Sequence, residues 1–131
     1  MRSGIVLVTL VVDDYDEAIG WFTDALGFEL VEDSPRGPGK RWVVVAPPGA
    51  EGAALLLARG HGGQQRDRIG DQAGDRVGFF LHTKDFAASY ERMRVAGVRF
   101  LEEPRHEDYG SVVVFEDLYG NRWDLMQPSA G

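Results

Sequence analysis

A strand-helix-strand-strand-strand pattern occurs twice in this chain, with an offset of about 70 residues between the two copies. The first copy spans about residues 4–58, and the second spans about residues 76–128. A glycine-rich linker at about residues 59–75 separates them. A repeat of this kind determines the architecture before any single element is considered. It predicts one α+β domain of residues 1–131, built from two tandem βαβββ modules.

Each module alone would form a small curved sheet with one helix on its outer face, and the other face of the sheet would stay apolar. Two such sheets side by side form an open, curved mixed β-sheet around a concave cavity, with the helices on the outside. A concave apolar surface is filled either by a core or by a ligand. The repeat therefore favours a small-molecule site within the cavity.

Helix boundaries are marked in the same way in both copies. Asp14 follows the apolar run of residues 5–12 and is a favourable N-cap, and Gly27 lies just beyond the last helical turn. Asp85 and Gly97 take the corresponding places in the second copy. We therefore expect the two helices to begin and end near these residues.

Strands are predicted where β-branched and aromatic residues cluster between turn signals. The predicted strands are residues 5–12, 28–32, 41–46 and 53–58 in the first copy and 76–83, 98–101, 112–115 and 122–127 in the second. The run 5–12 is apolar throughout, so we expect it to be buried on both faces. Residues 59–75 have no periodicity and many glycines, and both these residues and 104–109 are predicted to be loops.

The last two predicted strands form a hairpin around the turn residues 117–121. Alternation along the second of them places Arg122, Asp124 and Met126 on one face of the strand. Trp123 and Leu125 then lie on the other face. A carboxylate between two large hydrophobic residues in mid-strand requires an explanation, so Asp124 is the first candidate for a functional residue.

Composition and charge exclude several classes of function. The formal net charge of -7 disfavours nucleic acid as a partner, because phosphate binding needs a basic surface. The same charge is compatible with a cationic ligand, although a solvated acidic surface explains it as well. No apolar run reaches the length of a membrane span, no cysteine is present and no signal peptide is recognisable, so we expect a cytoplasmic protein without a membrane partner.

Two segments carry a resemblance to a known family: VTLVVDDYDEAIGWFTDALGF at residues 8–28 and FEDLYGNRWDL at residues 115–125. Together with the repeat, they resemble the vicinal oxygen chelate superfamily, which includes glyoxalase I, bleomycin resistance proteins, fosfomycin resistance proteins and extradiol dioxygenases. The closing segment is similar to the family pattern F-x-D-P-x-G-N-x-x-E-L, with Leu118 in place of the proline. The resemblance implies the fold over nearly the whole chain, whereas many chemistries share that fold.

The resemblance also implies four metal-ligand positions, one on each of the first, fourth, fifth and eighth strands. In this sequence they fall on Val8, Leu56, Gly78 and Asp124, and only Asp124 carries a side chain that binds metal ions. A catalytic metal normally needs three protein ligands. We therefore expect neither a metal nor another cofactor, with a divalent ion in a non-standard site as the alternative.

Strand alternation adds neighbours to these four positions on the face that would line the cavity. Most of these neighbours are apolar, and His82, Arg122 and Asp124 supply the polar groups. The set consists of Leu10, Val12, Phe80, His82, Arg122 and Met126. Apolar walls with a few convergent polar groups are typical of small-molecule sites.

Two of the polar residues have competing interpretations. His82 could act as a general acid or base, or it could be a half-exposed residue at the end of a strand. Asp124 could orient a ligand or accept a proton, or it could form a structural pair with Arg122, and both interpretations can hold together. No serine, histidine and aspartate stand in an order that suggests nucleophilic catalysis.

Aromatic and loop residues supply further candidates for ligand contacts. Trp42 could form an aromatic wall of the cavity or belong to the ordinary core. Arg105, His106 and Tyr109, in the loop of residues 104–109, could cover the mouth of the cavity or simply be solvated. His61 in the linker is predicted to be exposed and without a role.

These observations favour a metal-independent small-molecule binding protein similar to the bleomycin-resistance branch, with Trp42, Phe80, His82, Tyr109, Arg122, Asp124 and Met126 as candidate ligand contacts. The resemblance further implies a homodimer with ligand clefts near the subunit interface. One alternative is a metal-dependent lyase, isomerase or dioxygenase in which His82 or His106 joins Asp124 at a non-standard metal site. The other is a metal-free enzyme that uses His82 and Asp124 for proton transfer.

Overall fold

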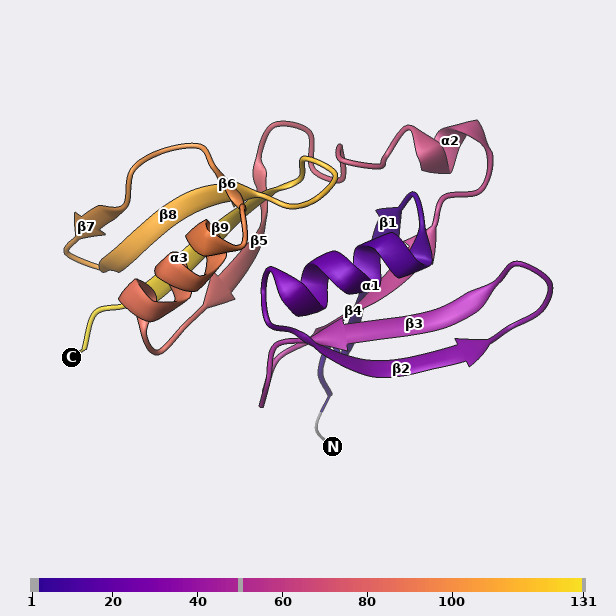
Figure 1. The fold of residues 1–131 in the computed structure, drawn as a ribbon, viewed down its shortest axis with the longest axis horizontal. Helices are drawn as coiled ribbons and strands as arrows, with labels where there is room; N and C mark the ends of the chain where they lie inside the picture. The colour runs from indigo at the N-terminus through magenta and orange to yellow at the C-terminus, as the bar shows by residue number, and fades with distance from the viewer. Residues whose placement is uncertain (1–2, 50, 131) are drawn as a thin grey trace. The chain divides into compact units, whose positions relative to one another are not determined.

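The computed structural model describes residues 3–49 and 51–130. The chain divides between Ile69 and Gly70 into two compact units, called here the first and the second module. Each module has a mixed sheet and a helix that covers one face of that sheet (Figure 1). The expected α+β fold with two open mixed sheets is therefore confirmed.

The first module follows the predicted βαβββ order and adds a short helix. Its sheet has the strand order β1-β4-β3-β2, in which β1 runs parallel to β4 and the other pairs are antiparallel. The elements are β1 (Leu7–Val12), α1 (Tyr15–Asp24), β2 (Glu29–Pro35), β3 (Arg41–Ala46), β4 (Ala54–Arg59) and α2 (Gly62–Arg66). The short helix α2 corrects the expectation that the linker has no regular structure.

Helix α1 begins and ends where the sequence predicts. The Asp14 side chain accepts a hydrogen bond from the backbone N–H of Glu17 at 2.8 Å, which satisfies one of the free donors of the first turn. Gly27 follows the helix with a φ of 69°, a conformation that favours glycine. Ala18 and Phe22 are completely buried and attach the helix to its sheet.

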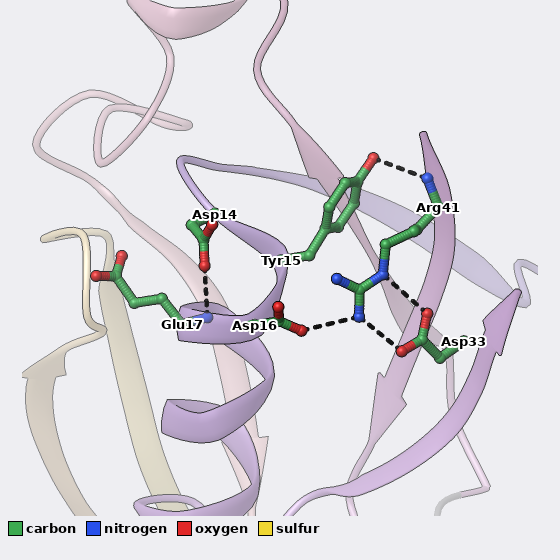
Figure 2. A network of polar contacts seen from close by, with 6 residues as sticks. All are labelled: Asp14, Tyr15, Asp16, Glu17, Asp33 and Arg41. Carbon is green, nitrogen blue, oxygen red and sulfur yellow. Dashed lines mark hydrogen bonds and ion pairs between the residues drawn. The ribbon is translucent and has the colours of Figure 1, made fainter. Parts of the chain in front are cut away.

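A polar network joins the start of α1 to the β2–β3 hairpin (Figure 2). The Arg41 guanidinium donates to both carboxylate oxygens of Asp33, at 3.1 and 2.7 Å, and pairs with Asp16 at 2.9 Å. It also lies over the Tyr15 ring, and the Tyr15 hydroxyl accepts from the Arg41 backbone N–H at 3.3 Å. The hydrogen bonds from Arg41 hold the pKa of the Asp33 carboxyl below its ordinary value.

The second module has the same topology with one additional strand. Its sheet has the order β5-β9-β8-β6, with β5 parallel to β9, and a short strand pairs with β8. That short strand, β7 (Arg105–Glu107), lies within residues 104–109 and corrects their prediction as a loop. The other elements are β5 (Val77–His82), α3 (Phe86–Val95), β6 (Arg99–Phe100), β8 (Gly110–Glu116) and β9 (Arg122–Pro128).

The predicted closing hairpin forms between β8 and β9, and a buried carboxylate organises its turn. Asp117 accepts hydrogen bonds from the backbone N–H groups of Tyr119 and Asn121, both at 3.0 Å. It also accepts from the Asn121 side chain and from the Trp123 indole N–H at 3.0 Å. Gly120 supplies the positive φ of the turn, at 99°.

A cluster of aromatic rings packs between the sheet and α3 of the second module. Phe79 and Trp123 stack with ring centroids 4.7 Å apart, and Phe115 lies 5.8 Å from Trp123. Phe100 connects these rings to α3, because it lies edge-on to Phe115 at 6.2 Å and tilted against Tyr90 at 4.6 Å. Such aromatic pairs stabilise a core beyond their buried area. This packing also determines which face of the sheet α3 covers.

None of the helices within residues 3–49 and 51–130 is long and apolar enough to cross a membrane.

Candidate functional site

The pairing of strands in the second module places most of the candidate residues on the face that α3 does not cover, called here the helix-free face. Phe80 is the partner of Asp124 across β5 and β9, and Asp124 is the partner of Val114 across β9 and β8. Directly paired residues lie on the same face of a sheet. The same rule adds His82, Met126, Val112 and Arg105 to this face.

Asp124 is half-buried on the helix-free face. Its Oδ1 atom is buried, and no hydrogen-bond donor from the described part of the chain reaches it. Burial raises the pKa of the Asp124 carboxyl above its ordinary value, because the charged form loses solvation. The positive charge of Arg105 opposes this rise in pKa, and the negative charge of Glu102 adds to it.

Arg105 on β7 is held in place by its neighbours. Its Nε donates to Glu102 Oε1 at 2.9 Å, and its Nη1 lies 3.5 Å from Glu107 Oε1. The other oxygen of Glu102 accepts the backbone N–H of Val114 at 2.9 Å. Glu102 therefore joins Arg105 to β8, the strand beside Asp124. The prediction did not include Glu102, because its role depends on a strand pairing that no local pattern reveals.

The expected pair between Arg122 and Asp124 does not form. Arg122 is exposed, and its Nη1 donates to the backbone oxygen of Asp75 at 2.8 Å. The two side chains share a face of β9, as predicted, but the long arginine side chain reaches the loop before β5 instead. Asp124 therefore lacks the counter-charge that the sequence suggested.

The other candidates on β5 and β9 share the helix-free face with Asp124. Phe80 is 66% exposed although it stands in the sheet beside Asp124. His82 is exposed and is paired with the half-buried Met126. The helix-free face thus combines an exposed aromatic ring, a thioether, an imidazole and a carboxylate.

The candidates from residues 104–109 divide between the two faces. His106 is paired with Ser111, whose Oγ lies 2.9 Å from its Nδ1, and its ring packs 6.2 Å from Phe86 of α3. His106 therefore lies on the face opposite Asp124, which contradicts the idea that the two residues share a metal site. Tyr109 is 52% exposed, and its hydroxyl accepts a long hydrogen bond of 3.4 Å from Arg105.

In the first module the strand pairing revises the expected positions. Val8 is the partner of Leu55, whereas Thr9 is the partner of Leu56. Val8 therefore lies on the face covered by α1, opposite to Leu56. Leu10 and Val12 share the face of Val8, are completely buried and belong to the core. The expectation that Val8, Leu10 and Val12 line a ligand cavity with Leu56 is wrong.

Strand β1 is also less buried than expected. Val8 is 42% exposed and Thr9 is exposed, so the strand is buried only toward its end. Trp42 is half-buried on the face that α1 does not cover, and Arg36 lies over its ring at 5.5 Å. Trp42 thus has a cation–π partner and is not part of the buried core.

The residues at the family's metal positions do not fit a metal ion. Val8 lies on the wrong face, Leu56 is apolar, and Gly78 has no side chain. A Cβ at Gly78 would stand 3.2 Å from the Ala73 Cβ, so the loop before β5 occupies part of the space that a ligand side chain would need. Throughout residues 3–49 and 51–130, no three His, Asp or Glu side chains gather in a way that could hold a metal ion.

The family is shown by the match of residues 4–125 to the Glyoxalase/Bleomycin resistance protein/Dioxygenase superfamily, to which this chain belongs. An uncharacterized protein of Shewanella frigidimarina is 53% identical over 128 residues, which cover 97% of this chain and 95% of that protein.

Two solved structures are similar along almost their whole length. The structure of UcmS2 has a TM-score of 0.82 and 33% identity, covering 96% of this chain and 98% of that one. The structure of TnmS3, an antibiotic binding protein from Streptomyces sp. CB03234, has a TM-score of 0.78 and 30% identity, with 98% of both chains covered. The fold is therefore one on which antibiotic binding is known, and family membership supports a ligand-binding role.

Proposed function

We propose that this protein binds a small molecule without a metal ion, and that the ligand lies on the helix-free face of the second module beside Asp124. The observation that carries the proposal is the Asp124 carboxylate, whose buried Oδ1 has no donor within the described residues. An unsatisfied carboxylate in an apolar setting destabilises the free protein. A ligand that donates a hydrogen bond to this carboxylate offsets part of that cost on binding.

The surroundings of Asp124 suit a binding site. Phe80, across the β5–β9 pair, and Met126, two residues further along β9, offer apolar surface beside the carboxylate, and Glu102 holds Arg105 nearby. Apolar surface with a few fixed polar groups is typical of small-molecule sites. The similarity to TnmS3, an antibiotic binding protein, supports the same class of function. A homodimeric assembly and a cytoplasmic location belong to the proposal as well.

The proposal is tested by calorimetric titration and by thermal melting with a panel of antibiotics and small metabolites. We expect at least one compound to bind wild-type protein and to raise its melting temperature, because binding to the native state stabilises it. The Asp124→Ala variant should lose most of this affinity, whereas Asp24→Asn, an exposed change in the first module, should keep it. Binding that survives in Asp124→Ala contradicts the proposed site.

A second candidate function is metal-free acid–base catalysis, which the position of His82 favours. His82 lies on the same face as Asp124. It is two residues along β5 from Phe80, which is the cross-strand partner of Asp124. This function requires a bound substrate within hydrogen-bond reach of both side chains. Once a ligand is known, turnover that persists in His82→Ala excludes acid–base catalysis by His82. Elemental analysis of untagged protein tests the metal-dependent alternative.

A further inference from the structure

We infer that the ligand brings a protonated nitrogen to Asp124 and rests an attached aromatic ring on Phe80. This inference depends on the proposed function, because it names the class of compound that the same face would bind. It follows from the charges around Asp124, from the exposure of the Phe80 ring and from the absence of a donor within residues 3–49 and 51–130.

The positive charge of Arg105, which acts on Asp124, is already compensated. Arg105 makes a hydrogen-bonded ion pair with Glu102 at 2.9 Å and a second ion pair with Glu107 at 3.5 Å. The charge of Arg105 lowers the pKa of Asp124, and the charge of Glu102 raises it. The Arg105 guanidinium thus pairs with Glu102 and Glu107, whereas Asp124 forms no ion pair within the described part of the chain.

The Asp124 carboxylate has an open position for a hydrogen-bond donor. Neither of its carboxylate oxygens accepts a hydrogen bond from the described residues, and only Oδ1 is fully buried. Oδ2 therefore retains access from the helix-free face. A protonated nitrogen at Oδ2 would form a charge-assisted hydrogen bond, which is stronger than a bond from a neutral donor. An anionic ligand would instead be repelled by Asp124, Glu102 and Glu107.

The ring of Phe80 determines what the nitrogen is attached to. Phe80 lies directly across the β5–β9 pair from Asp124, and the residue is 66% exposed. An aromatic ring on Phe80 buries apolar area, and a cation near the ring face gains further attraction. The formal net charge of -7 also favours the approach of cations. An aryl-alkyl ammonium compound satisfies all of these features.

Three probes of similar size separate charge from shape: benzylamine, benzyl alcohol and benzoate. Each is titrated into isotope-labelled full-length protein, and binding is followed through the backbone amide resonances of Phe80, Asp124 and Val114. We expect benzylamine to bind with a dissociation constant on the order of 1 mM, which is typical of a fragment. Benzyl alcohol should bind at least about fivefold more weakly, and benzoate should not shift these resonances.

Two variants and one control make the test specific. Asp124→Asn keeps the shape of the side chain and should reduce the preference for benzylamine over benzyl alcohol to less than about twofold. Phe80→Ala should weaken both probes, because both use the ring. Asp24→Asn removes one exposed carboxylate from the first module and should leave all three titrations unchanged. Thermal melts establish that each variant is folded.

The outcomes distinguish this inference from the function on which it rests. Equal binding of benzylamine and benzyl alcohol, or stronger binding of benzoate, overturns the cationic class and leaves a binding face in place. Unchanged benzylamine affinity in Asp124→Asn overturns the assigned contact. If no probe shifts resonances on this face, both the class and the proposed binding face are rejected.

Discussion

The indole N–H of Trp123 donates a hydrogen bond to Asp117 Oδ2 at 3.0 Å, which joins the turn of the closing hairpin to the strand that follows it. Asp117 is buried, and burial raises the pKa of its carboxyl while the hydrogen bonds from Asn121 and Trp123 act in the opposite direction. The Trp123 side chain, at the start of β9, therefore ties that strand to the turn that follows β8.

Replacement of Asp117 by alanine should strongly destabilise the second module. The change leaves the Trp123 indole and the Asn121 backbone N–H without their acceptor, and each buried unsatisfied donor costs roughly 1–3 kcal/mol. We expect a loss of about 3 kcal/mol or more in the free energy of unfolding, measured by urea denaturation. Asp117→Asn keeps one acceptor oxygen and should lose less, and a smaller loss for alanine than for asparagine would contradict this role.

Asp124→Asn should change the pH dependence of stability. Burial raises the pKa of Asp124 in the folded state, so the folded protein binds the proton more tightly than the unfolded chain does. The contribution of Asp124 to the free energy of unfolding is therefore fully present below the ordinary carboxyl pKa of about 3.9. It is lost as the pH rises through the higher pKa of the folded state. Asparagine cannot ionise and avoids this loss.

Thermal melts between about pH 4 and pH 8 measure this effect. We expect Asp124→Asn to melt at a higher temperature than wild type at neutral pH, with the difference shrinking toward acidic pH. The opposite trend, with wild type gaining relative stability as the pH rises, would mean that Asp124 has a favourable partner in solution.

Arg41→Ala should remove the connection between α1 and the β2–β3 hairpin (Figure 2). The network is partly solvent-exposed, so screening limits its contribution, and we expect a loss of about 1 kcal/mol in the free energy of unfolding. Arg41→Lys keeps the charge but not the paired hydrogen bonds to Asp33 and should lose part of this amount. The difference between wild type and Arg41→Ala should shrink in 1 M salt.

Gly110→Ala should destabilise the second module, whereas Gly20→Ala should not. Gly110 has a φ of 143°, and a Cβ there would collide with the backbone of Gln127 and Pro128. We expect a loss of about 2 kcal/mol or more. Gly20 lies within α1 with open space around it, so alanine there should stabilise the first module by up to about 1 kcal/mol. Equal effects of the two changes would contradict this account.

Local signals in the sequence predicted the parts of the fold that local physics determines. The caps Asp14 and Asp85 follow from the preference of their side chains for free N–H groups, and both form as expected. The hairpin turn follows in the same way from its glycine and its polar residues. The shared face of Phe80, Asp124 and Met126 follows from alternation within single strands and their pairing.

The errors arise where partners are distant in the sequence. Alternation within β1 cannot show that Val8 pairs with Leu55 and not with Leu56. The predicted register of β1 is therefore wrong by one residue, which places Val8 on the opposite face of the sheet. The partner of Arg122 is a backbone oxygen in the loop before β5, and no spacing on β9 indicates it. Asp117 resembles an ordinary turn residue in the sequence, and only the structure shows that it is buried.

In both modules the first strand lies beside the last one, with Leu7 opposite Ala54 and Val77 opposite Arg122. During synthesis on the ribosome, β1 therefore cannot pair with β4 until β4 has emerged, and β5 cannot pair with β9 until β9 has emerged. Long-range pairing of this kind slows folding because a long loop must close first. A nick inside a module separates its first strand from its last, whereas a nick between Ile69 and Gly70 leaves both strand pairings within single fragments.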